Sequence, residues 1–398
     1  MATDLVCFSH LRWDFVFQRP NHLMSRAARE RRVYYVEEPL PAEPGAADHV
    51  VTAVREGVVV VTPVLADGPV DLERRQEHLL RDYLGSQGVA RPVHWLQTPM
   101  AVSLSEALGR AVVVYDCMDD LTSFAEAPAK LQEREQRLLQ TADLVITGGV
   151  SLQRRIADRR PDAICLPSSV DTAHFQRATT AAAPADVASL PRPRFGYVGV
   201  IDERIDMDLV RALAGANPAG SVVLIGPVAK IDPDTIPVLP NVHQLGARRY
   251  EELPAYLGAL DVGIMPFAHN PATRYISPTK TPEYLAAGLP VASTGITDVQ
   301  TPYGRIGLVE VGDGADGFVA ACRRALATDL ARHRAFASDF LRTRSWDETW
   351  ATIDGRLRQI ERTLKAPRVP ATRSVPTSAG RRDRAAAESA RETRAAAS

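Results

Sequence analysis

The sequence is poor in cysteine, and the few cysteines that it has form no binding pattern. Four stand at positions 7, 117, 165 and 322 of the 398 residues. They form no Cys-x-x-Cys pair and have no histidine at metal-ligand spacing, as a disulfide framework or a zinc site would require. We therefore expect reduced thiols in a cytoplasmic protein without a bound metal.

Long hydrophobic runs are also missing. No apolar stretch approaches the ~20 residues that a membrane-spanning helix needs, so any membrane contact is expected to be peripheral, at the inner face. The N-terminus enters a strand pattern directly, without the basic and apolar regions of a signal peptide. The net charge is only -1, which gives no electrostatic reason to expect nucleic acid as a partner.

Apolar segments of strand length alternate with helical segments along most of the chain. The segments expected as strands are 4–8, 33–36, 58–61, 94–99, 111–116, 143–147, 164–167, 194–200, 221–225 and 261–267. This alternation is typical of an α/β protein with parallel sheets. No Gly-x-Gly-x-x-Gly follows any of these strands, which argues against a nicotinamide-dependent oxidoreductase, and no cofactor is expected.

The length allows two domains of ordinary size, and one composition change marks a boundary between them. Residues 178–193 are rich in alanine and proline and are interpreted as a linker between a first domain, 1–177, and a second, 194–344. A helix is expected over 345–365. The arginine-rich segment 366–398 has no aromatic residue and is expected to be disordered.

The helix expected over 345–365 begins with a capping box and carries one apolar stripe. Ser345 and Glu348 stand at capping-box spacing. The apolar residues at helical spacing are Trp346, Trp350, Ile353, Leu357, Ile360 and Leu364. From periodicity alone, the stripe packs either on its own domain or back on the first one.

The segment 277–294 carries the strongest site pattern in the chain. It lies between two apolar strands and contains one helix. Pro282 has no amide hydrogen and fits only a first helical turn, so the N-cap is expected between Thr279 and Thr281. Gly288 then closes the helix.

This short helix brings phosphate-binding chemistry to the end of a strand. A helix N-terminus at the carboxyl end of a parallel strand offers free amides to a phosphate or diphosphate. Lys280 adds a full positive charge, and Glu283 is placed to accept hydrogen bonds from a ribose diol. The alternative is an ordinary β-α-β unit whose loop happens to contain Lys and Glu.

The pattern Ser-Pro-Thr-Lys-x-x-Glu-Tyr-x-Ala-x-Gly-x-Pro-Val-x-Ser over 277–293 resembles the donor-binding segment of retaining, nucleotide-sugar-dependent glycosyltransferases with the GT-B fold. The resemblance implies that Glu283 holds the nucleotide ribose and that the helix amides hold the diphosphate. The donor-binding residues expected in this segment are Ser277, Thr279, Lys280, Thr281 and Glu283.

One position departs from that family pattern. Many members carry a second, earlier glutamate that contacts the sugar, and this chain has Tyr275 in its place. The neighbouring Arg274 is a candidate for a second phosphate or sugar contact. A solvated loop arginine is the alternative interpretation of Arg274.

Two segments of the first half resemble a bacterial branch of the same group 1, family 4-like enzymes, the surface or exopolysaccharide glycosyltransferases. They are Phe-Ser-His-Leu-Arg-Trp-Asp-Phe-Val-Phe-Gln-Arg-Pro-x-His-Leu at 8–23 and Tyr-Asp-Cys-Met-Asp at 115–119. The resemblance spans roughly residues 4 to 365. It implies two Rossmann-like domains that face each other across a cleft, with a C-terminal helix that crosses back to the first domain.

Arg204 lies in the loop after the first strand of the second domain. The resemblance implies that a basic residue in this loop contacts the donor phosphates and stabilises the leaving group. A guanidinium suits this role because it binds a diphosphate at two points and keeps its charge. In the alternative, Arg204 only pairs with Asp202 or Asp206 on the surface.

Three residues of the first half are further catalytic candidates. Asp116 and Asp119 follow a strand, and one of them is expected to orient a sugar hydroxyl or to polarise the acceptor nucleophile. A structural cap for the next helix is the alternative. A metal-binding pair is not favoured, because GT-B enzymes use helix amides and basic side chains in place of Mg²⁺. His10, in an aromatic and basic loop, is the third candidate, with a packing role as its alternative.

Together these features predict a metal-independent enzyme that moves a sugar from a nucleoside-diphosphate donor to a hydroxyl of a glycan or lipid-linked acceptor. Retention of configuration is what the resemblance implies. Two alternatives remain open: a nucleotide-sugar epimerase or hydrolase of the same fold, and a non-catalytic nucleotide-sugar-binding scaffold. The arginine-rich segment 366–398 is expected to hold the protein near anionic lipid or to act only as a linker.

Overall fold

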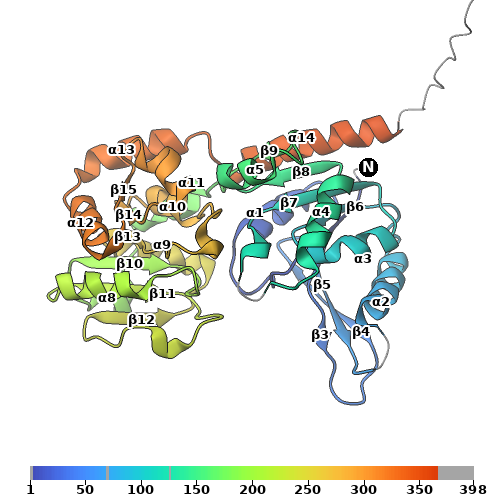
Figure 1. The fold of residues 1–398 in the computed structure, drawn as a ribbon, viewed down its shortest axis with the longest axis horizontal. Helices are drawn as coiled ribbons and strands as arrows, with labels where there is room; N and C mark the ends of the chain where they lie inside the picture. The colour runs from blue at the N-terminus through green and yellow to red at the C-terminus, as the bar shows by residue number, and fades with distance from the viewer. Residues whose placement is uncertain (1–2, 69–70, 125–126, 366–398) are drawn as a thin grey trace, which may run out of the picture. The chain divides into compact units, whose positions relative to one another are not determined.

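The computed structural model describes residues 3–68, 71–124 and 127–365 (Figure 1). Two sheets with helices packed against them make up most of these residues, and those up to Glu361 form one compact unit. The predicted disordered segment, 366–398, lies outside the described residues. In the part of the chain that is described, no helix is long and apolar enough to cross a membrane.

The first sheet has nine strands within the described residues, in the order β3-β5-β2-β1-β6-β7-β8-β9, with β4 paired to β5. They are β1 (Leu5–Phe8), β2 (Val33–Val36), β3 (Leu40–Pro41), β4 (His49–Arg55), β5 (Val58–Leu65), β6 (Val93–Leu96), β7 (Val112–Cys117), β8 (Leu144–Thr147) and β9 (Ile164–Cys165). The neighbours pair in parallel, apart from β4, which runs antiparallel to β5. The central strands are buried on both faces, which explains their unbroken apolar runs.

The helices of the first half connect these parallel strands or follow the last of them. They are α1 (Arg19–Ala27), α2 (Leu72–Ser86), η1 (Pro99–Ala101), α3 (Val102–Ala107), η2 (Leu121–Ser123), α4 (Leu131–Thr141), α5 (Val150–Ile156), α6 (Thr172–Gln176) and η3 (Arg177–Thr179). One core contains Trp95 and Val114, and another contains the alternate strand residues Leu96 and Tyr115. The sheet therefore has a hydrophobic core on each face.

The second sheet has six parallel strands in the order β12-β11-β10-β13-β14-β15, counted over the described residues. They are β10 (Arg194–Val198), β11 (Ser221–Ile225), β12 (Val242–Gly246), β13 (Val262–Met265), β14 (Val291–Ser293) and β15 (Val309–Val311). The helical elements of this half are α7 (Ala185–Ala188), α8 (Met207–Ala216), η4 (Pro233–Thr235), η5 (Tyr250–Glu252), α9 (Leu253–Gly258), η6 (Pro271–Thr273), α10 (Lys280–Ala286), α11 (Thr297–Val299), η7 (Gln300–Gly304), α12 (Gly314–Leu326) and α13 (Leu330–Leu341).

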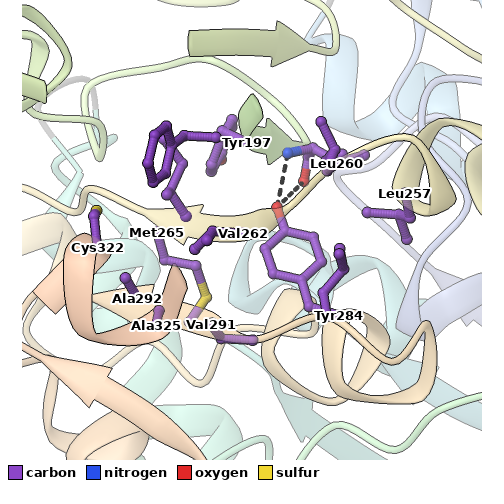
Figure 2. Close-up of a cluster of buried hydrophobic side chains, with 14 of the residues drawn as sticks. Tyr197, Leu257, Leu260, Val262, Met265, Tyr284, Val291, Ala292, Cys322 and Ala325 are labelled. Carbon is purple, nitrogen blue, oxygen red and sulfur yellow. Dashed lines mark hydrogen bonds between the residues drawn. The ribbon is translucent and has the colours of Figure 1, made fainter. Parts of the chain in front are cut away.

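Tyr284 attaches α10 to the middle of the second sheet (Figure 2). Its hydroxyl accepts a hydrogen bond from the Val198 N–H at 2.7 Å and lies 3.4 Å from the Val198 carbonyl. Its ring lies against Gly263 of β13, where an added Cβ would approach the ring to 2.5 Å. Only glycine at 263 lets α10 pack this closely on the sheet.

The segment predicted as a linker, 178–193, has regular structure and buried residues. It contains α7, and the side chains of Ala178 and Val187 belong to the core of the second sheet. Phe175, which precedes the segment, belongs to the same core. The domain boundaries placed at 177 and 194 stay a prediction.

The last helix, α14 (Trp346–Lys365), packs on the first sheet rather than on the second. The capping box is present, with the Glu348 N–H donating to Ser345 Oγ at 3.1 Å. Five residues of the predicted stripe, Trp346, Trp350, Ile353, Leu357 and Ile360, pack in the core that contains Trp95. Leu364 is 55% exposed and is an exception to the stripe. Periodicity left two packing partners open for this helix, and the structure shows that α14 packs on the first half of the chain.

A buried ion pair reinforces this packing. Arg31 Nη2 lies 2.6 Å from Asp354 Oδ1, and the Arg31 side chain is fully buried. Such a pair costs desolvation energy, but removal of one partner leaves an uncompensated charge. The pair therefore favours this position of α14 over others.

Further contacts join residues of the two halves. The Ser151 N–H at the start of α5 donates to Asp298 Oδ1 at 3.0 Å. The rings of Phe17 and Tyr250 stack at a centroid distance of 4.5 Å. Polar and aromatic contacts therefore both connect the first half with the second.

The densely charged helix α4 has one solvated and one buried face. Gln132, Glu133 and Arg137 are exposed, while Leu138 and Leu139 are buried. Glu135 is also buried and forms an ion pair with Arg155 at 2.9 Å. The charge pattern did not reveal this internal pair, because Arg155 lies on another helix.

We expect Leu357→Ala to lower the free energy of unfolding by about 2–5 kcal/mol, because it leaves a cavity between α14 and the first sheet. Leu326→Ala is the matched control, since Leu326 is 42% exposed, and should change the stability by only about 0.5 kcal/mol. Urea unfolding of both variants measures the difference. Equal losses would contradict the assigned packing of α14.

Candidate functional site

The helix α10 begins and ends where the sequence predicts. Thr279 is the N-cap residue, Pro282 lies in the first turn, and Gly288 has φ +76° just after the helix. Thr281, Tyr284 and Leu285 are buried, while Lys280 and Glu283 are half-buried. Lys280 and Glu283 therefore lie at the margin of the buried side of the helix.

A pocket brings this side of α10 together with residues of the first half. Among the predicted site residues, its lining contains Asp119, Arg204, Ser277, Thr279, Lys280 and Glu283. Most of the other lining residues lie at or just beyond the carboxyl ends of strands, in the loop before α1 or near the start of α10, and include Phe17, Gln18, Arg19, Met118, Gly148, Ser168, Val198, Gly199, Phe267 and Pro278. The carboxyl ends of parallel strands are the usual ligand edge of such sheets.

The side chain of Lys280 lies against Gly199, whose lack of a side chain leaves room for it. An added Cβ at Gly199 would overlap Lys280 Cε and would lie 2.6 Å from Nζ. Gly199 has φ +145°, a conformation that side-chain-bearing residues rarely adopt. Lys280 Nζ lies 5.2 Å from the centroid of the Tyr197 ring, within cation–π range. The strand end of β10 thus shapes the position of the ammonium group.

Burial shifts the pKa values of both charged residues of α10 toward neutral pH. The pKa of Lys280 is lowered to about 8, mainly by burial and also by the charge of Arg204, against the opposing effect of Glu283. The pKa of Glu283 is raised to about 7 by burial, against the opposing effect of Lys280. Both side chains are therefore poorly solvated, which makes them responsive to a charged ligand.

Arg204 both pairs with Asp202 and lines the pocket. Its Nε lies 2.9 Å from Asp202 Oδ1 and 3.1 Å from Oδ2. Burial lowers the pKa of Arg204, but the hydrogen bonds and charge of Asp202 outweigh this effect and raise it. Asp206 caps α8 instead. Arg204 therefore pairs with Asp202, as the alternative interpretation proposed, but it also lines the pocket.

Asp119, from the first half, lies near the positive charges of Arg204 and Lys280. Burial raises the pKa of the Asp119 carboxyl, and the charges of Arg204, Lys280 and Arg19 oppose the rise. Asp119 thus lies among three cations, two of them from the second half. Its catalytic role stays a prediction.

Asp116 and Thr281 do not line the pocket. Asp116 is fully buried and forms an ion pair with Arg19, whose Nη2 lies 2.9 Å from Oδ1. Arg19 Nη1 also donates to the Leu166 carbonyl at 2.8 Å, and Arg19 itself lines the pocket. Thr281 is fully buried, with Oγ1 3.5 Å from Met265 Sδ. Instead of the predicted contacts, Asp116 positions Arg19 and Thr281 packs in the core.

Arg274 and Tyr275 lie at a different pocket. The Arg274 guanidinium lies 5.2 Å from the centroid of the Tyr275 ring, and both residues line a pocket with His269, Asn270 and Ser123. Arg274 is exposed, in agreement with the solvated alternative. The residue at the position of the family's first glutamate is therefore not brought to Lys280 and Glu283.

His10 is not part of the pocket lining either. Its pKa is lowered to about 4, mainly by burial and also by the charge of Lys230, against the opposing effect of a hydrogen bond to the Gln97 backbone. Other residues of the same loop pack elsewhere: Arg12 pairs with Glu37 at 3.0 Å. Of the first-half candidates, only Asp119 lines the pocket.

The sequence missed several lining residues of the first half. Phe17, Gln18 and Gly148 were not predicted as site residues. Their signal was positional, because residues just beyond parallel strands meet at one edge. In the described residues, no group of three or more His, Cys, Asp or Glu side chains is arranged to hold a metal ion.

The structure resembles solved structures over nearly its whole length. Sucrose-phosphate synthase from Thermosynechococcus elongatus matches with a TM-score of 0.69 and 16% identity, over 91% of this chain and all of that one. A trehalose-6-phosphate protein from E. coli, bound with UDP-2-fluoro glucose, matches with a TM-score of 0.66 and 11% identity, over 90% and 99% of the two chains.

The chain has the GT-B fold. The Anabaena protein Alr3699/HepE, in complex with UDP and glucose, also matches this GT-B chain, with a TM-score of 0.59 and 15% identity over 92% and 100% of the two chains. The fold predicted from the resemblance is therefore confirmed: two parallel Rossmann-like sheets with a C-terminal helix that returns to the first.

A curated relative agrees with the resemblance to bacterial glycosyltransferases. The GT-B chain is 24% identical over 273 residues to the putative teichuronic acid biosynthesis glycosyltransferase TuaH of Bacillus subtilis, which covers 64% of this chain and 68% of that protein. No family model matches the sequence. The resemblance to the bacterial branch is confirmed by this match.

We expect Gly199→Ala to destabilise the protein by about 1–3 kcal/mol, because the new methyl group overlaps Lys280 and the backbone is strained. Gly215→Ala is the matched control, since Gly215 lies in α8 with nothing within 4 Å of its added Cβ. The control should be neutral or stabilising by up to about 1 kcal/mol. Chemical denaturation measures both, and equal effects would show that Lys280 does not depend on Gly199.

Proposed function

We propose that the chain is a glycosyltransferase that moves a sugar from a nucleoside-diphosphate sugar to a hydroxyl of an acceptor, with retention of configuration. The observation that carries the proposal is the pocket in which Lys280, Arg204 and Glu283 of the second half face Asp119 of the first. The GT-B fold and the relatedness to TuaH support it.

The donor diphosphate is assigned to Lys280 and Arg204. Both are cations in a poorly solvated pocket, where charge interactions are stronger than in water. Ser277 and Thr279 line the same pocket beside them. The carboxylate of Glu283 then accepts hydrogen bonds from the nucleotide ribose.

The chemical step depends on stabilising negative charge on the leaving diphosphate. As the bond between sugar and phosphate breaks, the Arg204 guanidinium, held by Asp202, stabilises the charge that develops. The acceptor hydroxyl attacks from the same face as the leaving group, which retains the configuration. Asp119 orients a sugar hydroxyl or the acceptor nucleophile. In this proposal the basic side chains take the place of a metal ion.

The acceptor is proposed to be a hydroxyl of a growing glycan or a lipid-linked glycan, in a cytoplasmic reaction at the inner face of the membrane. The role that the name of TuaH gives it, teichuronic acid biosynthesis, supports a polysaccharide acceptor. A second pocket, of about 450 Å³, lies at the carboxyl ends of β1 and β2 and is lined by Glu37, Glu38 and Arg134. It offers acceptor space on the first half.

A non-catalytic nucleotide-sugar-binding protein is the second candidate. The observation that favours it is the position of Tyr275, which packs under Arg274 outside the main pocket and supplies no sugar-binding carboxylate there. Binding of nucleoside diphosphate without transfer from any donor would support it. Release of nucleoside diphosphate without an acceptor would instead indicate a hydrolase or epimerase.

We expect Glu283→Ala to weaken binding of a nucleoside diphosphate about 10- to 100-fold, because a charged hydrogen-bond partner of the ribose is lost. UDP is the first probe, and calorimetry measures its affinity. Glu310→Ala is the control, since Glu310 forms a surface ion pair with Arg324, and should leave the affinity unchanged. Equal affinities of Glu283→Ala and wild type would remove Glu283 from the site.

We expect Arg204→Ala to lower kcat about 100- to 1000-fold, with a smaller loss of donor affinity, because its charge acts mainly on the leaving group. Arg211→Ala is the control: Arg211 also pairs with an aspartate, Asp208, but lies on the exposed side of α8. Steady-state kinetics and calorimetry separate the two quantities. Equal losses in kcat and in affinity would argue against a leaving-group role.

A further inference from the structure

Two polar side chains near the pocket have buried atoms without a hydrogen-bond partner in the described part of the chain. They are His10, at Nδ1, and Gln97, at both Nε2 and Oε1. Gln97 is only 2% exposed. A buried amide that makes no hydrogen bond destabilises the protein, so a ligand or water is expected to bond to it when the protein works.

Both residues follow strands of the first sheet, at the carboxyl ends of the strands, where the pocket also lies. The strands β1, β6 and β7 are adjacent, parallel and end at the same edge. His10 is the second residue after β1, and Gln97 is the first residue after β6. Met118 and Asp119 hold the first and second positions after β7, and both line the pocket.

The alternation of side chains places Gln97 on the Arg19 side of the sheet. Trp95 and Val114 share one core, on one face of the sheet. Gln97 and Asp116 follow them by two positions and therefore point to the same face. Asp116 is bound to Arg19, which lines the pocket. The unpaired amide of Gln97 is thus next to the first-half side of the pocket.

The hydrogen bonds of His10 determine what its free nitrogen offers. With a pKa of about 4, mainly because of burial, the ring is neutral near pH 7 and carries one N–H. The hydrogen bond to the Gln97 backbone raises the pKa, as a bond from the ring to the carbonyl oxygen does. The N–H is used in that bond, so Nδ1 is left as an acceptor.

We propose that His10 and Gln97 bind two neighbouring hydroxyl groups of a sugar ring, either on the transferred sugar or on the acceptor sugar. The two side chains offer two acceptors and one amide donor group, and none of them is charged. Hydroxyls both donate and accept, so they satisfy this set, whereas a carboxylate or phosphate only accepts. The inference rests on the proposed function and adds residues that select neutral hydroxyls.

The first experiment removes the amide without changing its size much. Gln97→Met is compared with Gln153→Met, because Gln153 Nε2 donates to the Ala163 carbonyl at 3.0 Å and does not line the pocket. Calorimetry is carried out with UDP and with the nucleotide sugar that most raises the melting temperature in a thermal-shift panel. Transfer to a panel of neutral glycosides is measured with the same donor.

The outcomes show whether the transferred sugar or the acceptor sugar is bound. If the transferred sugar is bound, Gln97→Met lowers affinity for the nucleotide sugar about tenfold or more and leaves that for UDP unchanged. If the acceptor sugar is bound, both affinities stay and kcat/KM for the acceptor falls by a similar factor. If neither changes relative to Gln153→Met, the proposal is overturned.

A second experiment separates ligand binding from a purely structural role of His10. The amide of an asparagine at this position lies near Nδ1, whereas that of a glutamine lies near Nε2. A ligand at Nδ1 predicts that His10→Asn keeps more of the sugar-dependent affinity or acceptor kcat/KM than His10→Gln. A structural role, through the bond to the Gln97 carbonyl, predicts the reverse order. This comparison also applies if Gln97→Met does not fold.

Failure of this inference is distinct from failure of the proposed function. If wild-type protein binds UDP, Glu283→Ala weakens that binding and the His10 and Gln97 variants behave as wild type, only the hydroxyl-binding role is lost. If wild-type protein binds no nucleoside diphosphate or nucleotide sugar, the proposed function itself is wrong.

Discussion

The hydrogen bond between the Tyr284 hydroxyl and the Val198 backbone determines where the charged residues of the pocket lie. It attaches α10 to the central strand β10, whose next residue is Gly199. Because Lys280 lies one helical turn before Tyr284, the same attachment brings Lys280 to the end of β10. Lys280 then fills the space that Gly199 leaves. A single buried contact thus couples packing of the second sheet to the geometry of the site.

The pocket combines opposite charges that the fold holds in a poorly solvated place. Arg204 is kept in position by Asp202, and Asp119 approaches from the other half. Such an arrangement costs stability, because each charge loses solvation, and it is typical of functional sites. The crossing of α14 to the core of the first sheet makes the arrangement possible, since it ties the chain segment after the second sheet to the half that carries Asp119.

The sequence predicted the elements better than the faces of individual side chains. The limits of α10, the buried strands and the apolar stripe of α14 follow from local patterns, namely a proline, a glycine and periodicity. A local motif cannot tell which of three adjacent residues faces a ligand, and Thr281 proved to face Met265. Asp116 was misplaced because its partner, Arg19, is distant in the sequence. The partner of Arg204, Asp202, could be named from the sequence because it is only two residues away.

The shifted pKa values of Lys280 and Glu283 have a consequence for the energetics of ligand association. Near pH 7 to 8 a fraction of the Lys280 ammonium groups is deprotonated and a fraction of the Glu283 carboxyls is protonated. A bound diphosphate favours the charged form of Lys280, which takes up protons, whereas the ribose hydrogen bonds favour the carboxylate form of Glu283, which releases them. The heat of association then includes the ionisation enthalpy of the buffer, and its variation among buffers gives the net number of protons exchanged.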